Sequence, residues 1–134
     1  MPEQKIPITV VDTEPFVRSA RTFLTNSEIE DLRDYVSQYR ELGEIIEGTG
    51  GLQKLRWAPT GSNQGKRGGA RVIYYYGGDR IPLYLIATYR KSDKSDMSEP
   101  EKKAASKFVA LLRAEFAKKR TKVQQSVTVR KTQT

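Results

Sequence analysis

The sequence predicts a small α+β domain with a mostly antiparallel sheet of about four strands, an N-terminal helical hairpin and a C-terminal helix. Three observations carry this prediction. Apolar residues recur at helical spacing over residues 13–39 and again over 98–120. Between these stretches lie short segments rich in β-branched and aromatic residues, bounded by glycine. The 134 residues include no cysteine, so we expect one domain whose apolar core needs no disulfide.

The N-terminal part is expected to form one strand and two helices. Residues 7–12 are rich in β-branched side chains and predict the first strand. Thr13 is a suitable cap for the first helix. The second helix follows closely and begins with a capping box, formed by Thr25 and Glu28 or by Ser27 and Glu30.

Three further strands are expected over residues 52–57, 71–76 and 83–91, with a glycine-rich hairpin loop between the first two. In the first of them, alternation places Leu55 and Trp57 toward the core and Lys54 and Arg56 on the opposite face. Counting by two, Arg71 shares a face with Ile73 and Tyr75. In the same way, Lys91 shares a face with Leu85, Ala87 and Tyr89. Because we expect helices on one face of the sheet, the basic side chains should converge on the other.

The last helix is predicted to begin at Asp96 or Ser98 and to end near Arg120. Its apolar stripe is expected to be Ala104, Phe108, Leu111, Leu112 and Phe116. Residues 1–120 would then form the folded domain. Residues 121–134 would form a basic, mobile C-terminal tail.

The positive charge is concentrated in the second half of the chain. The net charge is +8, but residues 1–51 carry five basic and ten acidic residues, whereas residues 52–134 carry 19 basic and six acidic residues. Residues 54–91 hold eight basic residues and one acid, Asp79. This asymmetry indicates a polyanionic partner, most simply a nucleic acid.

Two ordinary interpretations remain open at this point. The basic strand residues are also typical of a solvated sheet face, and the loop with Lys66 and Arg67 is either a connector or an arm that binds a nucleic-acid backbone. Histidine is absent, which excludes Ser-His-Asp and Cys-His triads and histidine metal ligands. No stretch has the length of a membrane span, so we expect a soluble cytoplasmic protein with no membrane contact.

The central motifs resemble the HigB-type branch of the RelE/ParE toxin superfamily, whose members are toxins of type II toxin-antitoxin systems. The resemblance covers roughly residues 13–118 in element order, and its specific part is residues 48–91. The matching residues are Gly48-Thr49-Gly50-Gly51-Leu52, Lys54-Leu55-Arg56, Gly65-Lys66, Gly68-Gly69, Arg71-Val72-Ile73-Tyr74-Tyr75, and Tyr89 with Lys91. A combined pattern of this length is far more selective than a single glycine motif.

The resemblance implies a small RelE-like fold and a ribosome-dependent mRNA endonuclease that cuts in the ribosomal A site. It implies metal-independent chemistry without a cofactor, in which the ribose 2′-hydroxyl attacks the adjacent phosphate. By this resemblance Lys54 lies near the 2′-hydroxyl, Arg71 binds the scissile phosphate, and Lys91 stabilises charge or donates the leaving proton. We assign Arg56, Lys66, Arg67, Arg90 and Lys94 to RNA or ribosome binding.

The expected partners are a cognate antitoxin, the ribosome and mRNA, with DNA contacted only through the antitoxin complex. One departure concerns the chemistry, because RelE has a C-terminal tyrosine in its site and residues 92–96 here contain none. The acid that protonates the leaving oxygen is therefore unassigned. Two alternatives remain, a ParE-like inhibitor of DNA gyrase and a nucleic-acid-binding module without catalysis.

Overall fold

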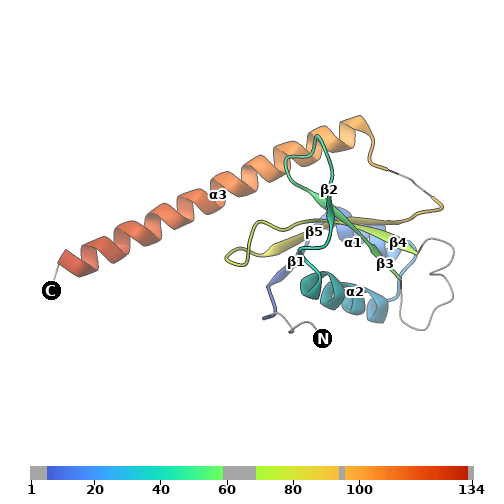
Figure 1. Cartoon of the computed structure of the whole chain (residues 1–134), viewed down its shortest axis with the longest axis horizontal. Helices are drawn as coiled ribbons and strands as arrows, with labels where there is room; N and C mark the ends of the chain where they lie inside the picture. The colour runs from blue at the N-terminus through green and yellow to red at the C-terminus, as the bar shows by residue number, and fades with distance from the viewer. Residues whose placement is uncertain (1–5, 59–68, 94–95, 133–134) are drawn as a thin grey trace.

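A computed structural model describes residues 6–58, 69–93 and 96–132, with side chains up to Lys119. The elements follow the order β1 (Val10–Asp12), α1 (Glu14–Arg21), α2 (Asn26–Gln38), β2 (Glu44–Ile45), β3 (Gln53–Trp57), β4 (Ala70–Tyr75), β5 (Leu83–Arg90) and α3 (Glu99–Thr132). The predicted α+β class is confirmed. Within the described residues the sheet has five strands in the order β1-β5-β4-β3-β2, and of their pairings β1–β5 is parallel and the others are antiparallel (Figure 1). The short β2 is the strand that the sequence did not predict.

The two N-terminal helices begin where local sequence signals placed them. Thr13 Oγ1 accepts a hydrogen bond from the Phe16 backbone at 3.4 Å and also donates one to the Leu85 carbonyl at 2.8 Å, so the cap fixes α1 to β5. Of the two capping boxes considered for α2, the one formed by Thr25 and Glu28 is present. Such reciprocal bonds satisfy backbone donors that a helix start leaves unpaired.

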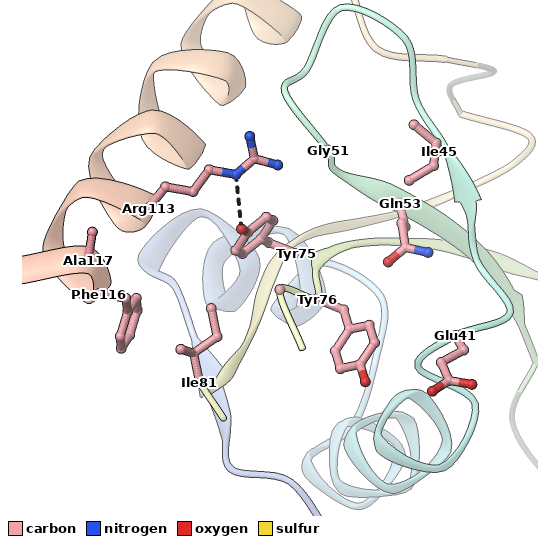
Figure 2. A pocket seen from close by; sticks show the side chains of 11 residues that line it. Glu41, Ile45, Gly51, Gln53, Tyr75, Tyr76, Ile81, Arg113, Phe116 and Ala117 are labelled. Atoms are coloured by element: carbon pink, nitrogen blue, oxygen red, sulfur yellow. Dashed lines mark hydrogen bonds between the residues drawn. The ribbon is translucent and has the colours of Figure 1, made fainter. Parts of the chain in front are cut away.

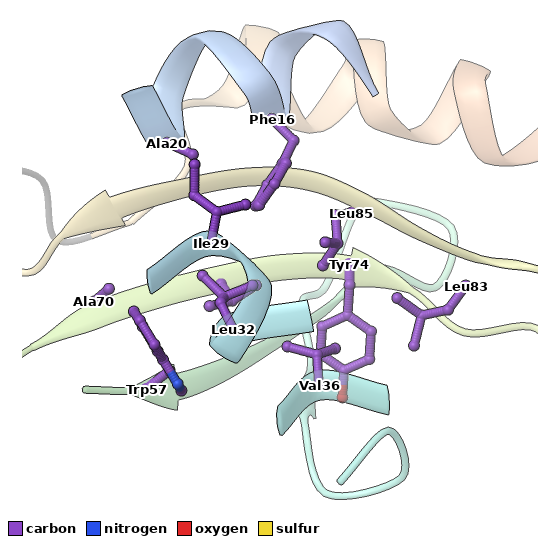
Figure 3. Close-up of a cluster of buried hydrophobic side chains, with 11 residues drawn as sticks. Phe16, Ala20, Ile29, Leu32, Val36, Trp57, Ala70, Tyr74, Leu83 and Leu85 are labelled. Atoms are coloured by element: carbon purple, nitrogen blue, oxygen red, sulfur yellow. The ribbon is translucent and has the colours of Figure 1, made fainter. Parts of the chain in front are cut away.

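The main core lies between the sheet and the pair α1 and α2 (Figure 3). Its fully buried members include Phe16 from α1, Leu32 from α2, and Val72 and Leu85 from the sheet. Trp57 belongs to this cluster and Leu55 packs against it, as the alternation in β3 predicted. This core holds the central strands rigidly and sets the direction of the side chains on their other face.

The second face of the sheet is also covered, in part, by α3. Ala105 and Val109 pack there with Ile73 and Tyr75, so helices lie on both faces rather than on one as expected. The expected stripe is correct in part. Leu112 packs against this cluster and Phe108 and Phe116 contact the Tyr84 ring, whereas Leu111 is 68% exposed and Ala104 is exposed. Ala105 and Val109 face the sheet instead, and Val109 also lies beside the loop at residues 48–51, where a Cβ on Gly50 would lie 3.6 Å from the Val109 Cβ.

Helix α3 runs on to Thr132 and its C-terminal part projects beyond the sheet (Figure 1). The predicted end near Arg120 is wrong, because the sequence after Pro100 contains neither glycine nor proline to stop the helix. That residues 121–134 are mobile stays a prediction. Within the described part of the chain, no helix has both the length and the apolar character needed to cross a bilayer.

Buried Tyr74 predicts a pH-dependent stability. Burial raises its pKa to about 12, although the hydrogen bond from the Gly43 backbone lowers it. Since the neutral phenol is favoured in the folded state, its contribution is complete below pH ~10, the ordinary tyrosine pKa, and is lost as the pH rises toward 12. The difference in free energy of unfolding between wild type and Tyr74→Phe should therefore shrink as the pH rises from about 9 to about 12. Urea titrations at intervals of about one pH unit measure it. A constant difference would contradict the assignment.

Candidate functional site

Two arginines and a tyrosine form a row across the three neighbouring strands β3, β4 and β5. Arg71 in β4 pairs directly with Arg56 in β3 and with Tyr89 in β5. Residues directly opposite one another in a sheet project from the same face, so these three side chains share one face. Arg56 is exposed, and the other two are half-buried. This face is the one on which α3 packs farther along the strands.

Lys54 extends the cationic surface toward the edge of the sheet. It pairs with Ile73, two residues along from the Arg56–Arg71 pair, and therefore lies on the same face. Lys54, Arg56 and Arg71 line a hollow of about 420 Å³ together with Glu44, Tyr35, Leu42 and Leu55. The structure thus brings together three of the four strand residues that the sequence grouped.

The guanidinium of Arg71 has an unsatisfied donor. Its Nη1 atom is buried and has no hydrogen-bond partner among the residues that the structure describes. A buried donor without a partner costs about 1–3 kcal/mol. Facing Arg56 directly across the strands also costs stability, because like charges repel. A phosphate held between the two arginines would offset this repulsion, since its oxygens accept two parallel bonds from one guanidinium.

Tyr89 stands beside this guanidinium in a partly apolar setting. Its ring packs against the second apolar cluster, which includes Ile73 and Tyr75. Burial raises the pKa of Tyr89, Asp96 raises it further, and Arg71 lowers it, while Glu101 contributes a smaller rise. The phenol therefore keeps its proton at neutral pH.

The predicted face of Lys91 must be corrected in part. Ile73 pairs with Ala87 but Tyr74 pairs with Leu85, so Ile86 is an extra residue and the strand carries a bulge. Leu85 consequently points into the core with α1 and α2, not to the face of Tyr89. Lys91 itself follows β5 and is exposed. Its backbone N–H lies 3.4 Å from the Gly69 carbonyl, which places it near the Arg56–Arg71–Tyr89 row.

Arg90, a further predicted binding residue, does not join this group. Arg90 pairs with Ala70, and its guanidinium carbon lies 5.3 Å from the ring centre of Phe23, which packs against the core on the opposite face. We therefore leave Arg90 out of the proposed site. Lys66, Arg67 and Lys94 lie outside the described residues, so their role stays a prediction.

A larger hollow of about 660 Å³ lies at the other end of the same face, between α3, β2 and the end of β4 (Figure 2). Arg113 reaches into it from α3 and donates to the Tyr75 hydroxyl at 3.3 Å, and Phe116 lines one side. Glu41 lines the opposite side. The predicted catalytic residues do not line this hollow, so its size alone does not make it the site.

Sequence reasoning missed the place of Tyr89 in the site. Tyr89 was expected on the face of Lys91, but its direct pairing with Arg71 depends on the strand register. Counting residue pairs along β4 and β5 from the turn that joins them could have paired Arg71 with Tyr89. The extra residue Ile86 shifts this count by one, so the pairing comes out wrong unless the bulge is known.

No protein-family model matches the chain. Among solved structures, the chain is similar to the toxin RelE of E. coli, in a mutant carrying two arginine-to-alanine substitutions and in the free state. The two share 15% sequence identity over 67% of this chain and 90% of that chain, with a TM-score of 0.45. A likeness this distant carries no argument about function, which must come from the residues of the site.

Proposed function

We propose that this protein is a HigB-type toxin of a type II toxin-antitoxin pair and acts as a ribosome-dependent endoribonuclease. The observation that carries the proposal is the cationic row at Arg71, whose buried Nη1 lacks a partner among the described residues and which lines one hollow with Lys54 and Arg56. The proposed reaction at this surface follows from the resemblance of residues 48–91 to HigB-type toxins. The substrate is mRNA in the ribosomal A site.

In the proposed reaction, Arg71 binds the nonbridging oxygens of the scissile phosphate. Lys54 lies on the β3 side, and the lone pair of its uncharged amine receives the proton of the ribose 2′-hydroxyl, whose oxygen attacks the phosphorus. Cleavage leaves a 2′,3′-cyclic phosphate and a 5′-hydroxyl. Arg56 and Lys91 stabilise the added negative charge of the transition state, as preorganised cations do in other phosphoryl reactions. Arg56, Lys66, Arg67 and Lys94 contact RNA or ribosome.

A cognate antitoxin would neutralise the protein, by covering the basic face or by keeping it from the ribosome. Because the substrate is translated mRNA, the protein would act in the cytoplasm, and expression of the chain alone should arrest growth. DNA would be contacted only through the antitoxin complex. The alternatives are ParE-like inhibition of gyrase and nucleic-acid binding without catalysis, and neither requires an unsatisfied arginine beside a lysine.

Primer extension on an mRNA translated in a purified system tests the proposal. We expect cuts within codons when ribosomes are present and none when they are omitted. Supercoiling by purified gyrase, measured in parallel with the same protein, should be unaffected. Intact mRNA together with inhibited supercoiling would favour the gyrase alternative, and cuts on free RNA would contradict the requirement for the ribosome.

A further inference from the structure

The proposed reaction lacks an acid for the departing 5′ oxygen, and this inference rests on that reaction. When the 2′ oxygen attacks phosphorus, the 5′ oxygen must leave from the opposite side. An alkoxide is a poor leaving group in water, so a positioned proton donor accelerates the step. The donor must therefore lie across the scissile phosphate from the base.

The strand order places side chains on both sides of a phosphate bound by Arg71. Arg71 occupies the middle strand, β4, with β3 on one side and β5 on the other. Neighbouring strands are about 4.8 Å apart, so groups on β3 and β5 flank an anion held by Arg71. Lys54 projects from β3, and Tyr89 projects from β5 directly opposite Arg71. A phosphate held by Arg71 would have the β3 cations, Arg56 directly across and Lys54 two residues along, on one side and Tyr89 on the other.

The setting of Tyr89 suits a proton donor. Its ring is held by the apolar cluster on the α3 side, which limits the positions that its hydroxyl can adopt. The guanidinium of Arg71 is close enough to favour the phenolate electrostatically, although burial and the carboxylates of Asp96 and Glu101 oppose it. The phenol thus stays protonated before the reaction, and a cation is at hand to stabilise the phenolate that forms.

We propose that Tyr89 is the general acid of the cleavage and donates its phenolic proton to the leaving 5′ oxygen. The bond from the 2′ oxygen to phosphorus forms as the bond from phosphorus to the 5′ oxygen breaks, and the Tyr89 proton moves to that oxygen. The phenolate left beside Arg71 then takes a proton from water. Tyr89 precedes Lys91 in the sequence. It would supply the proton donor that the segment after Lys91, which contains no tyrosine, does not provide.

A sulfur-substituted mRNA tests this role separately from structural effects. In one substrate the 5′ oxygen at the cleaved position is ordinary, and in the other it is sulfur, whose thiolate leaves without protonation. Ribosomes are programmed with either substrate, and cleavage is followed under single-turnover conditions. Tyr89→Phe should slow cleavage of the oxygen substrate by roughly 10²–10⁴-fold and leave the sulfur substrate near its wild-type rate.

Two further variants define the alternatives. Arg71→Ala should slow both substrates, because both carry the phosphate that Arg71 binds. Lys91→Ala should cleave the sulfur substrate no faster, relative to wild type, than the oxygen substrate. If sulfur restores the cleavage rate of Lys91→Ala but not that of Tyr89→Phe, Lys91 is the acid. Equal losses of Tyr89→Phe on both substrates, with an unchanged urea midpoint, would make Tyr89 a positioning residue and overturn the proposal. A wild-type protein that leaves both mRNAs intact would overturn the proposed function itself.

Discussion

Arg71→Ala should reduce ribosome-dependent cleavage by roughly 10²–10³-fold or more, the loss seen when one preorganised group that stabilises transition-state charge is removed. The reason is that Arg71 sits at the centre of the row, between Arg56 and Tyr89, with a buried donor free of partners among the described residues. Single-turnover cleavage of programmed ribosomes measures the effect. Growth arrest on expression should disappear in parallel.

Arg71→Lys separates charge from geometry in the same assay. Lysine keeps the positive charge but presents a point charge in place of a planar fork. If bidentate binding of the phosphate is what matters, Arg71→Lys should recover only a small part of the lost rate. Full recovery would mean that Arg71 contributes charge alone.

Arg90→Ala is the matched control, because it removes an arginine from the neighbouring strand on the opposite face, where the guanidinium lies over Phe23. Cleavage by this variant should remain close to wild type. Binding to ribosomes, measured by co-sedimentation, should change little in either variant. If Arg71→Ala instead lowers binding as steeply as cleavage, with a strong dependence on salt, the protein is better described as a nucleic-acid-binding module.

Helix starts in this chain could be predicted because their signals are local. Thr13 and the pair Thr25 and Glu28 each act within one helical turn, and the structure contains both caps. The faces of Lys54 and Arg71 were also predictable, since alternation along a regular strand needs no knowledge of the partner strand.

Features set by contacts between distant segments could not be predicted. The bulge at Ile86 reverses the expected face of Leu85, and it reflects the fit of β5 against both β4 and α1. Helix α3 packs on the sheet through Ala105 and Val109 and lies beside the glycine loop, where a Cβ on Gly50 would be 3.5 Å from Ser106 Oγ and 3.6 Å from Val109 Cβ. The pairing of Arg71 with Tyr89 follows from the same register, which is why the proposed acid became visible only in the structure.

Gly43→Ala should be among the most destabilising single changes in this fold. A Cβ at this position would lie 2.2 Å from the Tyr74 hydroxyl oxygen and 2.8 Å from the ring carbon that carries it. Tyr74 is fully buried and cannot move away cheaply. Its hydroxyl accepts from the Gly43 backbone and donates to the Arg40 carbonyl, both at 3.0 Å. Overpacking of this kind costs about 1–3 kcal/mol, and losing these two bonds adds to it.

A double-mutant cycle with Tyr74→Phe identifies the cause. Tyr74→Phe alone should lower the free energy of unfolding by about 1–3 kcal/mol, because it leaves the Arg40 carbonyl without this donor. The double variant removes the oxygen that the new methyl group would meet first, so it should be more stable than the sum of the two single losses predicts. Urea unfolding of the four proteins measures this. Strict additivity would show that the methyl group and the hydroxyl do not meet, and that the turn at Gly43 relaxes by another route.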